Sequence, residues 1–211
     1  MYRSGQVYTC KVKASRLSPQ TSDAILDAAW QLICRRGRAD VGLADIAKAA
    51  GVTRQSIYIG YGGRFGLLIA MARNADDRSA HCRRMREISN GEGNDPRTLH
   101  AYVEAWLAHL PEIYPVGILL SAAATTDPEA REVFADRMVG GLHAAYLTIC
   151  KRLGRARHLA RGWDAERAAD FCWSLTHIET WRQLVVERGW TPAELLADRQ
   201  AVIAKILVRP R

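Results

Sequence analysis

Polar side chains are concentrated in the short segment Thr53–Tyr58, whose sequence is TRQSIY. Every residue in it except Ile57 carries a hydroxyl, guanidinium or carboxamide group. Groups of these kinds donate hydrogen bonds to phosphate oxygens, and they also read the donor and acceptor pattern of base edges in the major groove. The segment therefore indicates contact with a nucleic acid, provided that one exposed helical face presents it.

The residues around this segment have the spacing of a helix-turn-helix. Ala47 is small enough for two helices to cross closely, Gly51 permits the positive φ of a tight turn, and Ile57 fills the angle between the helices. Three apolar residues supply the remaining contacts of the motif: Ile46, Ala50 and Val52. An ordinary helical hairpin inside a bundle is the alternative interpretation.

The elements that must position the motif follow from apolar periodicity. No stretch sustains a period of two, so the sequence predicts an all-α fold of about nine helices. The first helix should open at Thr21 or Ser22 and end at Gly37, and a polar loop should span residues 89–96. The other predicted helices span residues 43–50, 54–59, 64–88, 97–110, 112–124, 128–153, 164–188 and 192–208.

Positive charge is concentrated in the first third of the chain. The formal net charge is +8, and residues 1–64 hold 10 Lys and Arg against 4 Asp and Glu. A cationic segment on a nearly neutral body favours a polyanionic partner, and a solubilising surface is the alternative. The basic arm is expected to reach the DNA backbone or an adjacent minor groove through Arg3, Lys11, Lys13 and Arg16, or else to be a disordered tail.

Residues 21–71 resemble the DNA-binding domain of the TetR family of bacterial transcriptional regulators. The segments that carry the resemblance are ILDAAWQLICRRG, DIAKAAGV, TRQSIY and RFGLL, which follow one another with the spacing of the family. The resemblance implies a homodimeric repressor that binds a palindromic operator in double-stranded DNA and is released by a hydrophobic small molecule. A global or architectural DNA-binding protein of the same fold, without an effector, is the alternative.

The resemblance also implies which residues contact DNA. Thr53, Tyr58 and Arg64 would meet phosphates, whereas Arg54, Gln55 and Ser56 would read base edges. The predicted interface is completed by Gly42, Leu43 and Tyr61.

Three places depart from the family pattern. Gly42 stands where relatives usually have a capping Thr or Ser, so one capping hydrogen bond should be missing. Gly60 and Tyr61 replace a His and a Phe. Phe65 replaces an acidic residue after Arg64, which is expected to keep the cation that meets a phosphate.

The resemblance implies three parts of the chain: a basic flexible arm over residues 1–20, a helix-turn-helix DNA-binding domain over 21–66, and a helical effector-binding and dimerisation domain over 67–211. The predicted helix over residues 164–188 is apolar on two sides, and together with the final helix it would pair with the symmetry mates in a four-helix bundle. The predicted interface residues are Phe171, Leu175, Ile178, Val185, Leu195, Leu196, Ile203 and Ile206. Burial within one subunit is the alternative.

Aromatic and polar residues in the middle of the chain are candidates for an apolar ligand pocket. They are Tyr102, Trp106, His109, Tyr114, Phe134, Met138, Trp173 and His177. A plain hydrophobic core is the alternative for each of them.

Several other classes of function have little support. The six histidines form no metal-binding pair, and no nucleophile elbow or phosphate loop is present, so neither catalysis, a metal nor a cofactor is predicted. Five widely spaced cysteines form no C-x-x-C pair. The absence of a secretory signal and of a long apolar run predicts a soluble cytoplasmic protein. A third possibility is a helical small-molecule-binding protein or enzyme whose helix-turn-helix is incidental.

Overall fold

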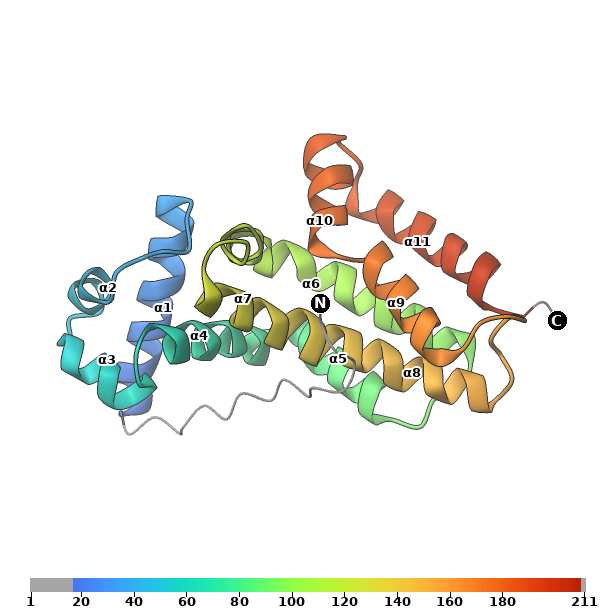
Figure 1. Cartoon of the computed structure of the whole chain (residues 1–211), viewed down its shortest axis with the longest axis horizontal. Coiled ribbons are helices and arrows are strands. Elements are labelled where there is room, and N and C mark those ends of the chain that lie inside the picture. The colour runs from blue at the N-terminus through green and yellow to red at the C-terminus, as the bar shows by residue number, and fades with distance from the viewer. Residues whose placement is uncertain (1–16, 210–211) are drawn as a thin grey trace. The chain divides into compact units, whose positions relative to one another are not determined.

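The computed structural model describes residues 17–209, which are almost entirely helical (Figure 1). The residues of the predicted basic arm up to residue 16 lie outside this range. The chain divides into two compact units. The first unit comprises the residues up to Asp77 together with Pro115–Gly140, and the second comprises Arg78–Tyr114 and Gly141–Arg211. The boundary predicted at residue 66 separates two functional domains, whereas these units are compact groups of contacting residues, so that boundary stays a prediction.

Helix α1 (Pro19–Arg36) begins earlier than the sequence suggested. Ser18 is its N-cap and accepts a hydrogen bond from the Thr21 amide at 3.2 Å, and Pro19 occupies the first turn, where its missing N–H costs nothing. The start predicted at Thr21 or Ser22 is therefore wrong. The predicted end is confirmed, because Gly37 caps the helix with a left-handed φ of 63°.

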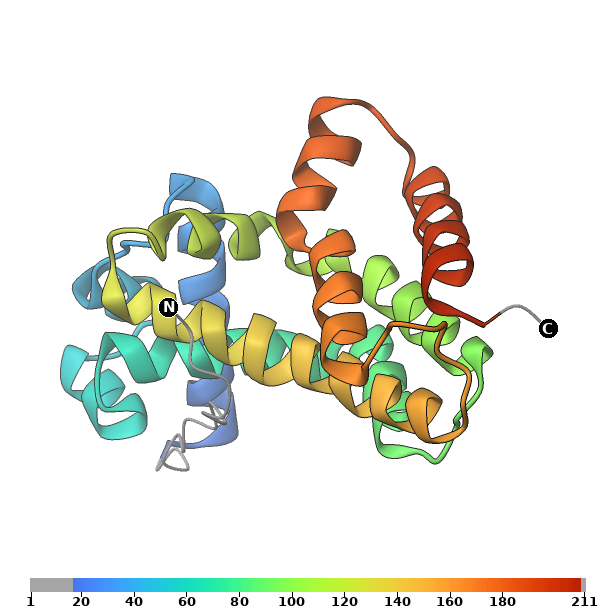
Figure 2. The same cartoon turned by 45° about the vertical axis from the view of Figure 1, so that its right-hand side comes forward.

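Three short helices follow in the first unit: α2 (Leu43–Ala49), α3 (Arg54–Tyr61) and α4 (Arg64–Arg78), which Figure 2 shows beside α1 in blue to green. Gly51 takes a φ of 67° in the turn between α2 and α3, as the motif requires. Ala47 and Ile57 are buried, with 3% and 0% of their surfaces exposed. The helix-turn-helix predicted from the spacing of these residues is present.

The turn from α3 into α4 is built by glycines. Gly62 caps α3 with a φ of 75°, and Gly63 has a φ of 138°. A Cβ atom at Gly66 would lie 1.9 Å from the Tyr61 carbonyl oxygen, so the backbones of the two helices approach more closely there than any side chain permits. The turn therefore fixes how α4 leaves the recognition helix.

The long helix predicted over residues 64–88 is interrupted at Ser79. This residue caps α5 (Ala80–Asn90) by accepting a hydrogen bond from the Cys82 amide at 3.3 Å. Serine is a preferred N-cap residue, because its hydroxyl accepts a hydrogen bond from a free amide of the first turn. Apolar periodicity alone does not reveal such a helix start.

Helix α6 (Pro96–Ala123) is continuous, although a break was predicted at Pro111. Proline inside a helix costs about 3 kcal/mol. Pro111 and Pro115 both lie inside α6, and the burial of the apolar side chains around them offsets their cost; these are Leu107, Leu110, Val116 and Leu120.

The remaining helices are interrupted more often than predicted. The segment predicted over 128–153 consists of α7 (Pro128–Ala135), a π-helical stretch η1 (Asp136–His143) and α8 (Ala144–Arg155). The segment predicted over 164–188 is broken at Thr176 and His177 into α9 (Ala165–Leu175), α10 (Ile178–Trp181) and the π-helical η2 (Arg182–Glu187). Helix α11 (Pro192–Leu207) is close to the prediction and begins with a capping box formed by Thr191 and Glu194.

Helices α8 and α9 pack against each other in the second unit, and α11 packs against α9 (Figure 1). An isolated bridge between Leu159 and Val208 is the only β pairing among the described residues. Within residues 17–209, no helix is both long and apolar enough to cross a membrane.

Candidate nucleic-acid interface

One side of α3 is fixed in the core of the first unit. Ile57 is fully buried, Gly60 is buried, and Tyr61 is 8% exposed. The Tyr61 hydroxyl lies 2.7 Å from the Ser22 hydroxyl and also donates to the Ser22 carbonyl at 3.3 Å. Burial raises the pKa of the Tyr61 phenol. These contacts determine which side of α3 faces outward.

The outward side of α3 presents two parallel rows of side chains. Arg54 and Tyr58 form one row, and Gln55 and Ile59 form the other, because residues four apart lie on the same face of a helix. All four residues are exposed. Neither Arg54 nor Gln55 has a hydrogen-bond partner among residues 17–209, so both can bind another molecule without breaking an internal bond.

The amino end of α3 is capped by Thr53. Its hydroxyl accepts a hydrogen bond from the Ser56 amide at 3.1 Å and lies 2.9 Å from the Ser56 hydroxyl. Thr53 therefore orients the first turn, and Ser56 is half-buried beside it. The helix dipole at this end favours an anion, which suits a phosphate near Thr53.

Gly42 is the N-cap of α2 and makes no side-chain capping bond, as the sequence predicts. It is exposed, whereas Leu43 is half-buried against the core of the first unit. Only backbone groups of Gly42 are therefore available for a contact at this end of α2.

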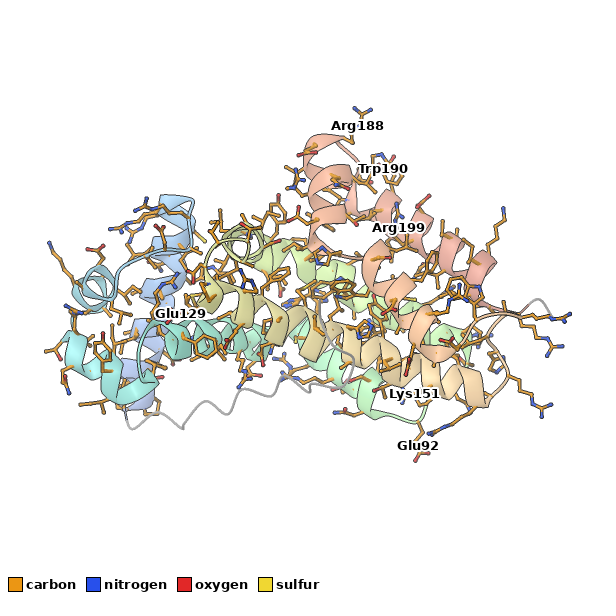
Figure 3. The ribbon with its side chains drawn as sticks, viewed as in Figure 1. Glu92, Glu129, Lys151, Arg188, Trp190 and Arg199 are labelled. Carbon is orange, nitrogen blue, oxygen red and sulfur yellow. The ribbon has the colours of Figure 1, made fainter. Side chains whose placement is uncertain are left out.

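Arg64 is occupied within the first unit. One guanidinium nitrogen lies 2.8 Å from Asp127 Oδ2 and 2.9 Å from Glu129 Oε2, and the other donates to the Ala39 carbonyl at 3.1 Å (Figure 3 labels Glu129). Partial burial raises the pKa of Asp127, but hydrogen bonds from the Ala130 amide and Arg64 outweigh it, and the net pKa is lowered. The carboxylate therefore stays charged opposite Arg64.

Two predicted DNA contacts are placed differently from the expectation. The Tyr61 side chain is buried against α1, since its large ring completes the core, and we leave it out of the proposed interface. Arg64 has a 21% exposed side chain that is held by two carboxylates, so a phosphate would have to compete with both. Nothing in TRQSIY or RFGLL could have revealed Asp127 and Glu129, which are more than 60 residues further along the chain.

A second ion-pair cluster in the first unit joins α4 to η1. Arg73 Nη2 lies 2.8 Å from Asp136, and Arg137 pairs with both Asp76 and Asp136. Burial lowers the pKa of Arg137 to about 10. Sequence reasoning missed this cluster, because its members come from two helices without a shared motif.

The predicted pocket residues are divided between the two units. In the second unit, Tyr102, Trp106 and His109 are buried, and Trp106 Nε1 donates to the Thr176 carbonyl at 2.7 Å. His109 Nδ1 lies 3.0 Å from the Ser79 hydroxyl. Tyr114, Trp173 and His177 of the same unit are half-buried. Phe134 and Met138 belong to the first unit.

The second unit also has an open depression of about 420 Å³, and Figure 3 labels Lys151, one of its lining residues. It is lined by Ser89, Asn90, Gly91, Thr148, Lys151, Arg152 and Arg155. The sequence did not indicate it, because Arg152 and Arg155 also serve as the basic residues that complement the carboxyl end of α8.

The predicted dimer residues divide into three groups by their exposure. Ile178, Leu195 and Ile203 are at most 1% exposed, so they belong to the core of the subunit, as the alternative interpretation holds. Ile206 is 39% exposed. Val186 of η2, which was not among the predicted interface residues, is another exposed apolar side chain, at 55%. The others, Phe171, Leu175, Val185 and Leu196, are half-buried.

The fold and this geometry define an all-helical protein with a helix-turn-helix near its amino end. The sequence profile described as bacterial regulatory proteins of the tetR family matches residues 25–71, which include α2, α3 and the start of α4. This part of the chain is therefore similar to the DNA-binding region of the tetR family.

One curated relative is similar to part of the chain. The regulator AlkX of Mycobacterium tuberculosis, described as an HTH-type transcriptional regulator, is 41% identical over 56 residues, which are 26% of each chain. The match thus spans about a quarter of that relative.

Solved structures extend the likeness in fold to most of the chain. NalD of Pseudomonas aeruginosa, the secondary repressor of the MexAB-OprM multidrug efflux pump, has a TM-score of 0.69 at 22% identity over 90% of this chain and 96% of its own. FadR of Bacillus subtilis, solved in complex with stearoyl-CoA, has a TM-score of 0.68 at 18% identity over 86% of this chain and 96% of its own.

Proposed function

We propose that the protein is a dimeric, non-enzymatic transcriptional repressor that binds a palindromic operator through α3. The observation that supports this most directly is the outward face of α3, where Arg54, Gln55 and Tyr58 are exposed above a buried Ile57. The first residues of a recognition helix enter the major groove and contact base edges. Arg54 is suited to guanine and Gln55 to adenine, because each can form two parallel hydrogen bonds.

A two-fold dimer is part of this proposal. Two helix-turn-helix motifs about 34 to 36 Å apart match successive major grooves, and a palindrome mirrors the symmetry of the dimer. Val186 and Ile206 give the last elements of the second unit exposed apolar surface, which a dimer would cover.

Release by a hydrophobic small molecule is the regulatory half of the proposal. Among similar folds, FadR was solved with stearoyl-CoA, and a regulator of Saccharomonospora viridis was solved with choline. A ligand that favours another position of α4 would also move α3, because Gly66 and the Tyr61 carbonyl leave no space between these helices. DNA would then be released by a shift in population.

The DNA-binding half is tested by selecting operators from a random duplex pool. The selected duplex should be palindromic, and affinity should fall steeply as salt rises, because phosphate contacts release counterions. Equal affinity for the selected and a scrambled duplex would contradict the proposal.

A DNA-binding protein without an effector is the second candidate. It is favoured by the packing of Tyr102, Trp106 and Tyr146, which fill the second unit and are at most 4% exposed. Tyr102 and Tyr146 pack edge to face with ring centroids 5.0 Å apart. A thermal-shift screen against hydrophobic acids, thioesters and amines separates the candidates, because a true effector raises the melting temperature and releases DNA.

A further inference from the structure

The recognition helix carries an exposed apolar side chain that hydrogen bonding to DNA does not explain. Ile59 is 53% exposed. Across residues 17–209, four large apolar side chains are exposed, and the two that belong to the first unit are neighbours on α3, Tyr58 and Ile59. Tyr58 has a hydroxyl that can donate to a phosphate, whereas Ile59 has no polar group at all.

Ile59 shares a row with Gln55. The two residues are four apart on α3, and both are exposed on the side opposite the buried Ile57 and Gly60. A separation of four residues places the side chains about 6 Å apart along the helix axis. When Gln55 reaches a base edge, Ile59 lies one helical turn further along the same groove.

The chemistry of base edges restricts what Ile59 can contact there. In the major groove, the C5-methyl group of thymine is the apolar group that distinguishes one base. The remaining groups by which bases are distinguished there are hydrogen-bond donors or acceptors. Covering a polar base edge with the sec-butyl side chain of Ile59 would leave that edge without water or a partner, which is unfavourable. Covering a methyl group is favourable.

We propose that Ile59 reads a thymine methyl group in the operator. This inference rests on the proposed function of α3. With base pairs about 3.4 Å apart, the thymine lies within about two base pairs of the base that Gln55 reads. Ile59 is thus a specificity residue that selects thymine over cytosine and over uracil.

The test replaces single thymines of a selected operator half-site by uracil, which pairs identically but lacks the methyl group. We expect one position at which the wild-type protein binds about three- to fivefold more weakly, the effect of losing one buried methyl group. Ile59→Ala should bind the thymine operator more weakly by a similar factor and should not distinguish thymine from uracil there. Ile59→Val, which keeps a branched apolar chain, should retain most of the distinction.

The outcomes separate this inference from the proposed function. A wild-type protein that prefers its operator but tolerates uracil at every position would overturn the role of Ile59 alone. Retention of the full uracil penalty by Ile59→Ala would also overturn it. If no duplex is selected at all, the proposed function fails and this inference fails with it. Circular dichroism and non-specific DNA affinity should be unchanged in both variants, because Ile59 lies outside the core.

Discussion

Gln55 and Tyr58 occupy different rows on the outward face of α3, and we expect them to affect DNA binding differently. Gln55→Ala should lower the preference for the operator over scrambled DNA by about 1 to 3 kcal/mol, because a two-bond base contact is lost. Tyr58→Phe should weaken binding to both duplexes alike, because a phosphate contact carries no sequence information. Titrations at one fixed salt concentration measure both, and equal losses on the two duplexes for Gln55→Ala would contradict its assignment.

His109 should make stability depend on pH. Burial lowers its pKa below the ordinary value of 6.5, although Glu112 opposes this, so the unfolded chain takes up a proton more readily than the folded one. The contribution is fully present above pH 6.5 and is lost as pH falls through the lowered pKa, with a slope of at most about 1.4 kcal/mol per pH unit. Urea unfolding at several pH values should show a shallower dependence for His109→Asn.

The matched control for that experiment is His81→Asn on α5. The His81 side chain is 41% exposed and lies 3.9 Å from Glu112, so its replacement shows how much of the dependence comes from that carboxylate and not from the buried His109. An unchanged slope in His109→Asn would assign the pH dependence to other groups.

At the level of elements, the start of α4 is tied to the start of α7 by Arg64, Asp127 and Glu129. If the carboxylates hold Arg64 away from DNA, Arg64→Ala should leave the salt dependence of DNA binding unchanged. Asp127→Asn combined with Glu129→Gln should free the cation and steepen the slope by about 1 per protomer. The slope of log affinity against log salt measures this.

Glu132→Gln is the matched control, because it removes a carboxylate from an exposed position on the same helix. A decrease of the slope by about 1 per protomer in Arg64→Ala would instead show that Arg64 meets a phosphate, as the sequence alone suggests.

The sequence predicted correctly the features that depend on local interactions, and it missed those that depend on contacts between residues far apart in the chain. The turn at Gly51 and the cap at Gly37 depend on local backbone conformation, and both were predictable from single residues. The continuity of α6 through Pro111 depends on packing that no local pattern encodes. The carboxylate partners of Arg64 lie 63 and 65 positions away, and Ser22 lies 39 positions from Tyr61, so the roles of Arg64 and Tyr61 required the folded chain.

At the level of the whole molecule, the exposed Val186 and Ile206 are the points at which a dimer should be sensitive. Val186→Asp or Ile206→Glu should shift the protein toward monomer, because a charge would be buried without a partner. Operator affinity should fall with it, since both half-sites are needed. Sedimentation velocity measures the change, with Gln31→Glu on the exposed side of α1 as the charge-matched control. Dimers that persist in both variants would place the interface elsewhere.

The glycine turn between α3 and α4 has a consequence for exchanging specificity between relatives. The side chains proposed to read DNA end at Ile59, whereas the close approach that sets the angle of α4 involves Tyr61 and Gly66. The reading surface and the joint are thus encoded by separate, consecutive stretches of sequence. Residues 53–59 of a relative, except at the buried Ile57, could therefore replace those of this chain. The turn that fixes the angle between α3 and α4 would stay unchanged, and so would any movement of α4 that it transmits to α3.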